Sequence, residues 1–335
     1  MAFTSGTATD YIDLADKFRA WITGTAGWTQ LAWTPGDVTT GGMSLSIRGP
    51  GAAADKRVFV NIQSVFDDSN QTYDWDIRGA VSYDGSKPFG SQESESSPSY
   101  LHLWKNAISY WFYANDRRFI IVAKVNTNYM SAHAGFFLPW GTPAQYPFPL
   151  FISASSGQLL PYNSTASNNR FFCDPGGNYN YGVVTDYCAG KIRTPEGNWV
   201  NVANHRSVTG NDAPWGSEPP NNPFVWPYVM RGSNGQGSTG SLIDWTVGSS
   251  SNGVVGDYGV VDKLVPTAQG ERMLLPLYIL TGAKPGGYGA IDGVYFPMGA
   301  GLTPEQTASI SSRDFRFFSN VHRTSGNDFF AIEEN

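Results

Sequence analysis

The stretch YWFYANDRRFIIVAKV, residues 110–125, decides how the rest of this sequence is interpreted. Two apolar runs flank a polar tip whose Asn115 and Asp116 are typical of a tight turn. Apolar residues occupy consecutive positions in both runs as far as Val122, so neither face of the two arms is polar. The stretch therefore predicts a β-hairpin that is covered on both faces, by its own domain or by a neighbouring subunit.

Two other interpretations of the hairpin compete with a rigid structural sheet. A membrane hairpin is disfavoured because each arm is only about six residues long, well short of a spanning segment. Burying Arg117, Arg118 and Lys124 in lipid would also cost about 2.5 kcal/mol or more each. An enzyme core stays open as an alternative, although no nucleophile or set of metal ligands lies near the hairpin in the sequence.

The composition favours a folded, β-rich protein. Of the 335 residues, 41% are hydrophobic and 14% are aromatic, which excludes a disordered chain. Only 15% are charged, against about 25% in a typical soluble domain, so uncharged polar residues must cover much of the surface. The net charge is −6 and no basic cluster exceeds two adjacent residues, so we expect no nucleic-acid partner.

The sequence also predicts neither export nor membrane insertion. Its start, MAFTSGTATDY, lacks the cationic and apolar regions of a secretory signal. The longest apolar stretches, FIIVA and LLPLYIL, are far shorter than the roughly 18–20 residues of a spanning helix. Cys173 and Cys188 are expected to be free thiols, as a reducing cytoplasm maintains them, and a single disulfide is the alternative.

One helix is predicted over residues 9–24, TDYIDLADKFRAWITG. Its apolar side chains recur at helical spacing along one stripe: Tyr11, Leu14, Ala15, Phe18 and Ile22. Thr9 is the expected N-cap and Gly24 the expected end. We expect this stripe to pack on its own domain, and docking on a neighbouring subunit is the alternative.

After Gly24 the hydrophobic period changes from that of a helix to that of strands. The predicted fold is mainly β, with antiparallel β-sandwich or barrel-like domains, a short N-terminal α-helix and long loops. Four segments divide the chain: a helical segment 1–23, a β-rich domain 24–155, a loop-rich aromatic insertion 156–256 and a C-terminal β segment 257–335. The last segment can complete the first domain.

The aromatic insertion supplies the candidate contact residues. Turn-forming residues dominate it, yet tryptophans and tyrosines are interspersed. Trp215, Trp226 and Tyr179 lie in polar loops, where a place in a core is hard to provide. Exposed aromatic side chains suit a protein interface, which is the commoner case, or stacking on a sugar ring. We therefore expect these three residues to contact a neighbouring subunit or a host glycan.

Recognised catalytic and cofactor motifs are absent from the sequence. The four histidines form no H-x-x-x-H or H-E-x-x-H pair, and no phosphate loop, EF-hand or nucleophile elbow occurs. Asp74 and Asp76 are candidate carboxylates for sugar hydrolysis, because residues two apart on a strand face the same side. More commonly, such carboxylates are solvated or bonded to a neighbouring arginine, which here would be Arg78. We predict a non-enzymatic protein with no catalytic, metal or cofactor site.

Four segments, in a fixed order, carry a resemblance to a known family. They are DRRFIIVAKV at 116–125, YMSAHAGF at 129–136, YPFPL at 146–150, and a tail over 292–332 that contains DGVY, NVHRT and DFFAI. This pattern resembles that of a family of tailed-bacteriophage virion proteins. The loop-rich insertion has no counterpart in the resemblance.

The resemblance implies a structural component of the particle, and no catalytic residue is carried over from it. A tail, baseplate or collar component fits best. Such a protein would assemble in the host cytoplasm with copies of itself and other virion proteins, in a symmetric ring or trimer. The alternatives are a tail receptor-binding protein that contacts a host surface glycan and, less favoured, a polysaccharide depolymerase.

Overall fold

The computed structural model describes residues 1–53, 55–163, 190–204, 223–226, 273–281, 287–298, 302–319 and 329–334. The predicted mainly β class is confirmed. The described strands form three sheets that are antiparallel apart from the pairing of β14 with β15, and one helix lies among the described residues. The sheets do not close on themselves, so the sandwich-like form of the prediction holds and the barrel-like form does not.

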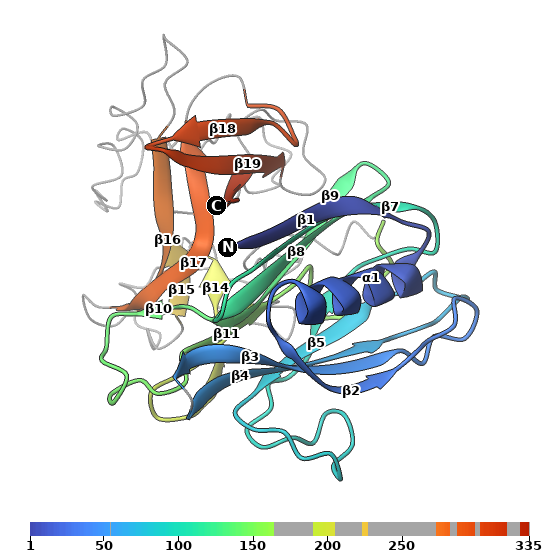
Figure 1. Cartoon of the computed structure of the whole chain (residues 1–335), viewed down its shortest axis with the longest axis horizontal. Helices are drawn as coiled ribbons and strands as arrows, with labels where there is room; N and C mark the ends of the chain where they lie inside the picture. Colours follow the sequence, from blue (N-terminus) through green and yellow to red (C-terminus); the bar gives the residue numbers. More distant parts are fainter. Residues whose placement is uncertain are drawn as a thin grey trace, which may run out of the picture.

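A seven-stranded sheet forms the middle layer of the molecule (Figure 1). The predicted hairpin is its β7–β8 pair, which lies inside the sheet and away from both edges. In spatial order the strands are β1 (Ala2–Ala8), β7 (Ile108–Ala114), β8 (Arg118–Val125), β9 (Asn128–Phe136), β11 (Leu150–Ser153), β12 (Lys191–Arg193) and β13 (Trp199–Asn201).

A five-stranded sheet lies on one side of the middle sheet, with the helix α1 (Tyr11–Gly24) between the two (Figure 1). Its strands are β2 (Thr29–Thr34), β3 (Ser44–Ala53), β4 (Lys56–Ser64), β5 (Trp75–Ala80) and β6 (Ser99–Leu101). Residues of α1 and of both sheets share one hydrophobic core.

The third sheet covers the opposite side of the middle sheet and is built mostly from the C-terminal part of the chain. Its strands are β10 (Leu138–Pro139), β14 (Ala203–Asn204), β15 (Pro223–Trp226), β16 (Met273–Thr281), β17 (Gly287–Met298), β18 (Thr307–Ile310), β19 (Arg313–Ser319) and β20 (Phe329–Glu333). The short strand β10 comes from the middle of the sequence and pairs with β17, so the two parts of the chain share a sheet.

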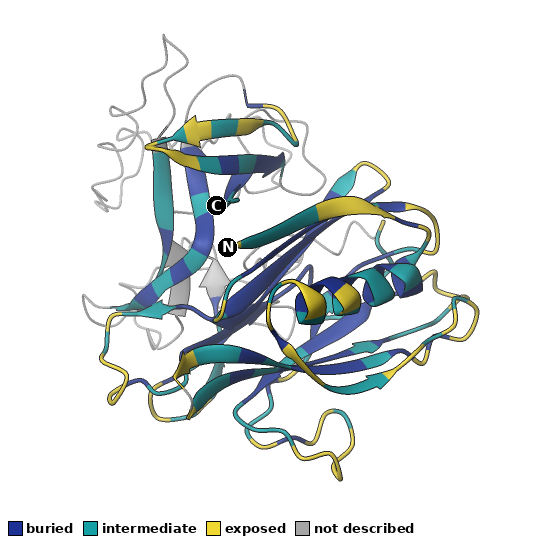
Figure 2. Ribbon diagram, viewed as in Figure 1, coloured by how far each residue is buried: buried dark blue, intermediate teal, exposed yellow. Residues whose placement is uncertain are grey.

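Both faces of the middle sheet are buried at its central strands, such as β8 and β9, whose residues enter two different cores (Figure 2). On β8, Phe119 and Ile121 enter the core shared with α1 and the five-stranded sheet. Ile120 and Val122, on the other face, enter the core shared with the third sheet. The hairpin is therefore covered on both faces by other parts of the same chain, and no neighbouring subunit is needed to cover it.

The predicted helix is confirmed, and its apolar stripe is buried against its own chain. Asp10, and not Thr9, is the N-cap: one Asp10 carboxylate oxygen accepts the N–H groups of Ile12 at 2.8 Å and Asp13 at 2.9 Å. Asp13 in turn accepts the N–H of Thr9 at 2.8 Å. A carboxylate suits this position because it caps free N–H groups and also faces the positive end of the helix dipole.

The start of the chain corrects the prediction of a helical segment over 1–23. Residues 2–8, AFTSGTA, form strand β1, which pairs with β7 along its whole length. The stretch carries no clear alternation of apolar and polar residues, so periodicity could not indicate a strand there. Its pairing partner, more than a hundred residues later in the sequence, decides its conformation.

Candidate functional site

The tip of the β7–β8 hairpin is organised by one side chain, that of Asn115. Its Oδ1 accepts the backbone N–H groups of Arg117 at 2.9 Å and of Arg118 at 3.0 Å. The backbone N–H of Asn115 also donates to the carbonyl of Arg118 at 3.0 Å. The carbonyl of Asn115 accepts the indole N–H of Trp28 at 2.9 Å. The predicted turn is therefore confirmed, and it is held by side-chain bonds that asparagine is well suited to make.

A buried ion pair joins this tip to the third sheet. Arg118 is 1% exposed, and its Nε lies 3.4 Å from Oδ2 of Asp292 on β17. The same carboxylate oxygen accepts a hydrogen bond from Nδ2 of Asn115 at 2.8 Å and lies 3.7 Å from Nη2 of Arg117. Three side chains of the hairpin tip thus converge on one carboxylate oxygen.

Electrostatics keep this pair charged. Burial lowers the pKa of Arg118 below its ordinary value, and the negative charge of Asp292 opposes that effect. Burial by itself raises the pKa of Asp292, but the charge of Arg118 and the hydrogen bond from Asn115 outweigh it, so its pKa is lowered. A carboxylate that stays ionised at neutral pH therefore faces a guanidinium that has almost no access to water.

Two glycines create the space for the buried guanidinium. Gly293, next to Asp292, has φ +76°, and a Cβ atom there would lie 1.7 Å from Nη2 of Arg118. Gly135 pairs with Arg118 across β8 and β9 and has φ +141°, and a Cβ there would lie 2.3 Å from the carbonyl oxygen of Arg117. Any side chain at either position would displace the ion pair.

His133 adds a buried titratable group behind the pair. It lies opposite Ile120 in the β8–β9 register, is fully buried, and packs its ring 5.1 Å from that of Phe151. Burial, followed by the positive charge of Arg118, lowers the pKa of His133 to about 3. The imidazole is therefore neutral at ordinary pH. We call Asn115, Arg118, His133, Asp292 and Gly293 the junction cluster.

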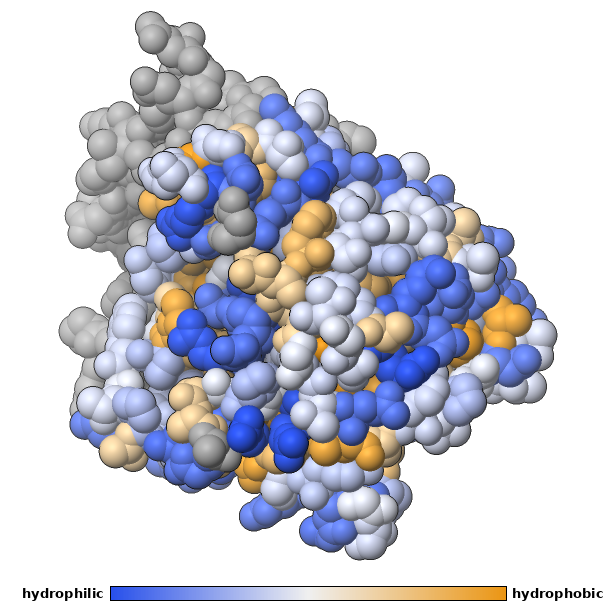
Figure 3. All heavy atoms as spheres, viewed as in Figure 1, coloured by the Kyte–Doolittle hydropathy of each residue, from blue (hydrophilic) through white to orange (hydrophobic). Residues whose placement is uncertain are grey.

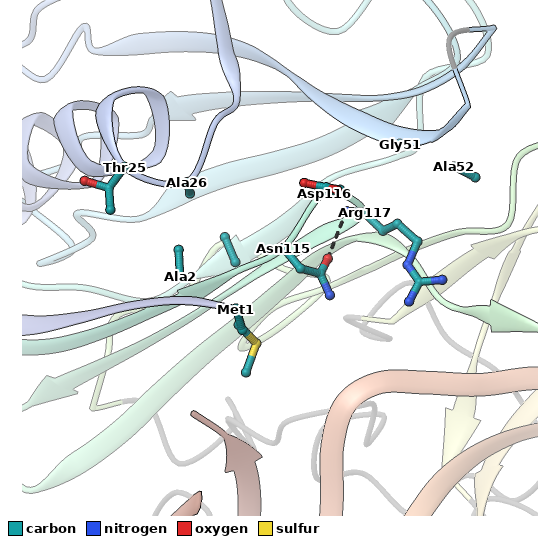
Figure 4. Close-up of a pocket in the computed structure, with 10 residues that line it drawn as sticks. Met1, Ala2, Thr25, Ala26, Gly51, Ala52, Asn115, Asp116 and Arg117 are labelled. Carbon is teal, nitrogen blue, oxygen red and sulfur yellow. Dashed lines mark hydrogen bonds between the residues drawn. The ribbon is translucent and has the colours of Figure 1, made fainter. Parts of the chain in front are cut away.

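An open pocket of about 590 Å³ lies at the same tip (Figure 4). Asp116 and Arg117 extend from the tip in different directions. Besides the tip, the lining comes from the start of β1, the chain after α1, and β3: Met1, Ala2, Thr25, Ala26, Gly51 and Ala52.

The carboxylates considered for sugar hydrolysis are buried in the sheet core. Asp74 has no exposed surface and lies 2.7 Å from Nδ1 of His102. Asp76 is 5% exposed and forms the predicted ion pair with Arg78, at 2.8 Å. Burial raises the pKa of both carboxyl groups, and the partners His102 and Arg78 oppose it. A glycan cannot reach either residue, so this pair does not form a glycosidase site.

Most of the aromatic and cysteine candidates cannot be placed. Four of them lie outside the described residues: Tyr179, Trp215, Cys173 and Cys188. The backbone of Trp226 lies in β15, opposite Tyr278 of β16. The expected contacts of these residues with a subunit or a glycan therefore stay predictions.

Trp140 is an exposed aromatic residue that the sequence interpretation missed. The residue is 56% exposed, although its backbone N–H donates to the carbonyl of Tyr288 at 3.0 Å. Its ring centroid lies 5.9 Å from that of Tyr278, the residue opposite Trp226. A tryptophan followed by Gly141 in a turn-rich stretch was the available signal, because turns lie at the surface.

The rest of the described surface gives few further leads. On the face in view, apolar side chains are scattered among hydrophilic ones (Figure 3). Within the described residues, no group of three or more His, Cys, Asp or Glu side chains could hold a metal ion. No helix of that part of the chain is long and apolar enough to span a bilayer.

Comparisons with known proteins do not extend the resemblance noted in the sequence. No model of a known protein family matches this chain, and no curated protein matches it either.

Loss of Asp292 is expected to destabilise the fold far more than loss of Arg117. Asp292→Ala leaves the guanidinium of Arg118 buried without its counter-charge, which costs about 3–5 kcal/mol. Arg117→Ala removes a partly exposed cation from the same carboxylate and is expected to cost less than about 1 kcal/mol. Denaturant unfolding followed by tryptophan fluorescence measures both losses.

The double variant Arg118→Met/Asp292→Leu is the control for this experiment. Replacing both charges by apolar side chains removes the uncompensated charge, so the double variant is expected to be more stable than Asp292→Ala alone. Equal losses for Asp292→Ala and Arg117→Ala would contradict the role given to the buried pair.

Acidification is expected to destabilise the fold through His133. The folded chain keeps this imidazole neutral down to about pH 3, whereas the unfolded chain protonates it near the ordinary value of 6.5. Because the folded pKa is the lower one, stability that is present above pH 6.5 is lost as the pH falls toward 3. The slope approaches about 1.4 kcal/mol per pH unit, and unfolding free energies measured across this window test it.

His133→Gln is expected to flatten the pH dependence between about pH 6.5 and 5, since a neutral amide takes up no proton in the unfolded state. Asp292 contributes in the same direction only at lower pH, because its unfolded pKa is near 3.8. If the variant keeps the slope of the unmodified chain, another group is responsible for it.

Proposed function

We propose that this chain is a structural component of a tailed-phage particle and that it acts by subunit packing. The observation that carries the proposal is the meeting of two distant segments of the phage-like pattern. DRRF supplies Arg118 and DGVY supplies Asp292 and Gly293, and these three residues touch one another in the junction cluster.

The other segments of the pattern lie around the same place. YMSAHAGF forms most of β9 and supplies His133 and Gly135, which pack beside Arg118. YPFPL leads into β11, whose first residue, Leu150, pairs with Phe136 of β9. The residues named from these segments thus have packing roles, whereas NVHRT, at 320–324, lies outside the described residues. A pattern made of packing residues supports a protein whose task is to hold a shape.

The architecture is consistent with such a task. Two cores share one middle sheet, so the sheets cannot move apart without exposing apolar side chains on both of its faces. A body of this kind transmits force between neighbours with little deformation, because close-packed interiors have low compressibility. A tail, baseplate or collar position, with copies of the chain in a ring or trimer, is part of the proposal.

Purified particles are expected to contain this chain in a fixed ratio to the major capsid protein. Quantitative mass spectrometry of particles banded on a density gradient measures that ratio, with the unbound lysate fraction as the control. If the chain is absent from the particle, or varies in amount with the washing conditions, it is not a structural component.

A second candidate function is binding of a host surface glycan, and Trp140 is the observation that favours it. An exposed indole beside a second ring, that of Tyr278, offers the flat apolar surface on which sugar rings stack. The rim is polar, because Thr142 and Gln145 bond to each other nearby on the same loop.

Under this second function, Trp140→Ala is expected to weaken binding of the purified chain to host polysaccharide by about tenfold or more, a loss typical of removing a central aromatic contact. Leu159→Ala, at another exposed apolar residue, is the matched control and should leave binding unchanged. Glycan-array or cell-binding assays measure the effect. Absence of binding by the unmodified chain would eliminate this candidate.

A further inference from the structure

Within the part of the chain that the structure describes, strand β1 is the longest open edge of the three sheets. The edge strands of the three sheets differ in length: β1 has seven residues, β2 six, β18 four, β6 and β13 three each, and β14 two. An edge strand presents a row of N–H and C=O groups that a further strand can pair with. The longest edge therefore offers the largest docking site of this kind.

The outer edge of β1 is accessible. Within the described part of the chain, β1 pairs with β7 only, and its central residues Ser5, Gly6 and Thr7 are exposed. Phe3 is held in place on one face, stacked 4.9 Å from Tyr113. In an antiparallel pair, the N–H and C=O groups of alternate residues point away from the partner. β1 thus holds a set of outward backbone groups in an ordered register.

β1 has none of the features that protect natural edges from pairing. Its sequence AFTSGTA contains no charged residue and no proline, and its register with β7 runs without a bulge. The next longest edge, β2, is different, because its register is interrupted between Gln30 and Ala32. β1 is therefore the edge on which addition of a strand meets the least resistance.

The pocket at the hairpin tip continues this edge. Met1 and Ala2, at the start of β1, are part of its lining, so the open edge leads into a space of about 590 Å³. In an antiparallel pairing centred on Ser5, Ala8 of an added copy of the strand would lie opposite Ala2. The pocket leaves room there for the chain that continues beyond the added strand.

We propose that β1 is the strand through which two copies of this chain pair, antiparallel and across a two-fold axis. A second copy is the occupant because, among the described edges, β1 itself is the best match to β1 in length and regularity. Its uncharged side chains also place no like charges opposite each other. The contact is isologous and joins two seven-stranded sheets into one. It rests on the proposed packing function and adds to it a two-fold contact, which would join two rings or trimers to each other and would not close one.

Sedimentation equilibrium of the purified chain tests the pairing. The unmodified chain is expected to form dimers, and Ser5→Lys should raise the dimer dissociation constant by about tenfold or more, because the two lysines then lie opposite each other across the axis. Thr7→Lys places its charge opposite Phe3 of the other copy and is expected to raise the constant by a smaller factor. Thr307→Lys, at an exposed threonine of the edge strand β18, is the matched control and should leave the constant unchanged. Circular dichroism establishes that each variant is folded.

Hydrogen exchange of the unmodified chain gives a second measurement that needs no variant. Backbone amides of residues 2–8 are expected to exchange more slowly at high than at low protein concentration, because pairing protects the outward groups. A monomer at all concentrations, a dimer that leaves these amides unprotected, or a dimer unaffected by both lysine variants would each overturn the proposal. If β1 instead binds a strand of a different virion protein, the purified chain will be a monomer, and this outcome overturns pairing between two copies.

These outcomes are separate from those of the proposed function. Dimers can form in solution whether or not the chain occurs in particles, and particle-bound chain can pack through other surfaces. A monomeric chain found in particles would overturn only the β1 contact, and a dimeric chain absent from particles would overturn only the virion role.

Discussion

Burial of a charged side chain at the tip of the central hairpin is the constraint on which the rest of the structure depends. Arg118 has almost no exposed surface, so its charge must be met by another charge from the chain. Asp292 supplies it from the third sheet, 177 residues beyond the Asn115 that shares the same carboxylate. Any arrangement of the C-terminal strands that moved Asp292 away would leave an unpaired cation in the core.

A buried ion pair of this kind adds little net stability, and its main effect is to favour one arrangement of the sheets over others. The desolvation cost of two buried charges offsets much of their attraction, whereas breaking the pair is expensive. The glycines sharpen this choice, since only a residue without Cβ leaves space for the guanidinium at Gly293. Apolar contacts between the sheets supply the stabilisation, and the junction cluster determines how the sheets are positioned.

This division has consequences for function. Among the described residues, the large apolar side chains that are exposed are those of Met1, Trp140 and Leu159. Strand β1 is an edge of the rigid body, and Trp140 lies on a loop anchored to β17 through the carbonyl of Tyr288. Both are held in fixed positions by the sheets, which reduces the entropy lost when a partner binds.

Features that depend on neighbouring residues could be predicted from the amino-acid sequence alone. The stripe of α1, the two-sided apolar arms of the β7–β8 hairpin, its Asn115 turn and the Asp76–Arg78 pair all follow from spacings of a few residues. Local spacing also led to wrong interpretations, since Thr9 was expected as the N-cap and residues 1–23 as helical, whereas Asp10 is the cap and residues 2–8 form β1.

Only the tertiary structure decided what depends on residues far apart. β1 is a strand because β7 pairs with it, although AFTSGTA shows no strand period of its own. The motif DGVY does not indicate that Asp292 and Gly293 contact Arg118, and only the fold brings them together. Trp140 is notable because its surroundings leave it exposed. Chain distance hides such contacts, because hydrophobic period and turn chemistry report only on neighbours, whereas charge pairing and burial depend on the whole fold.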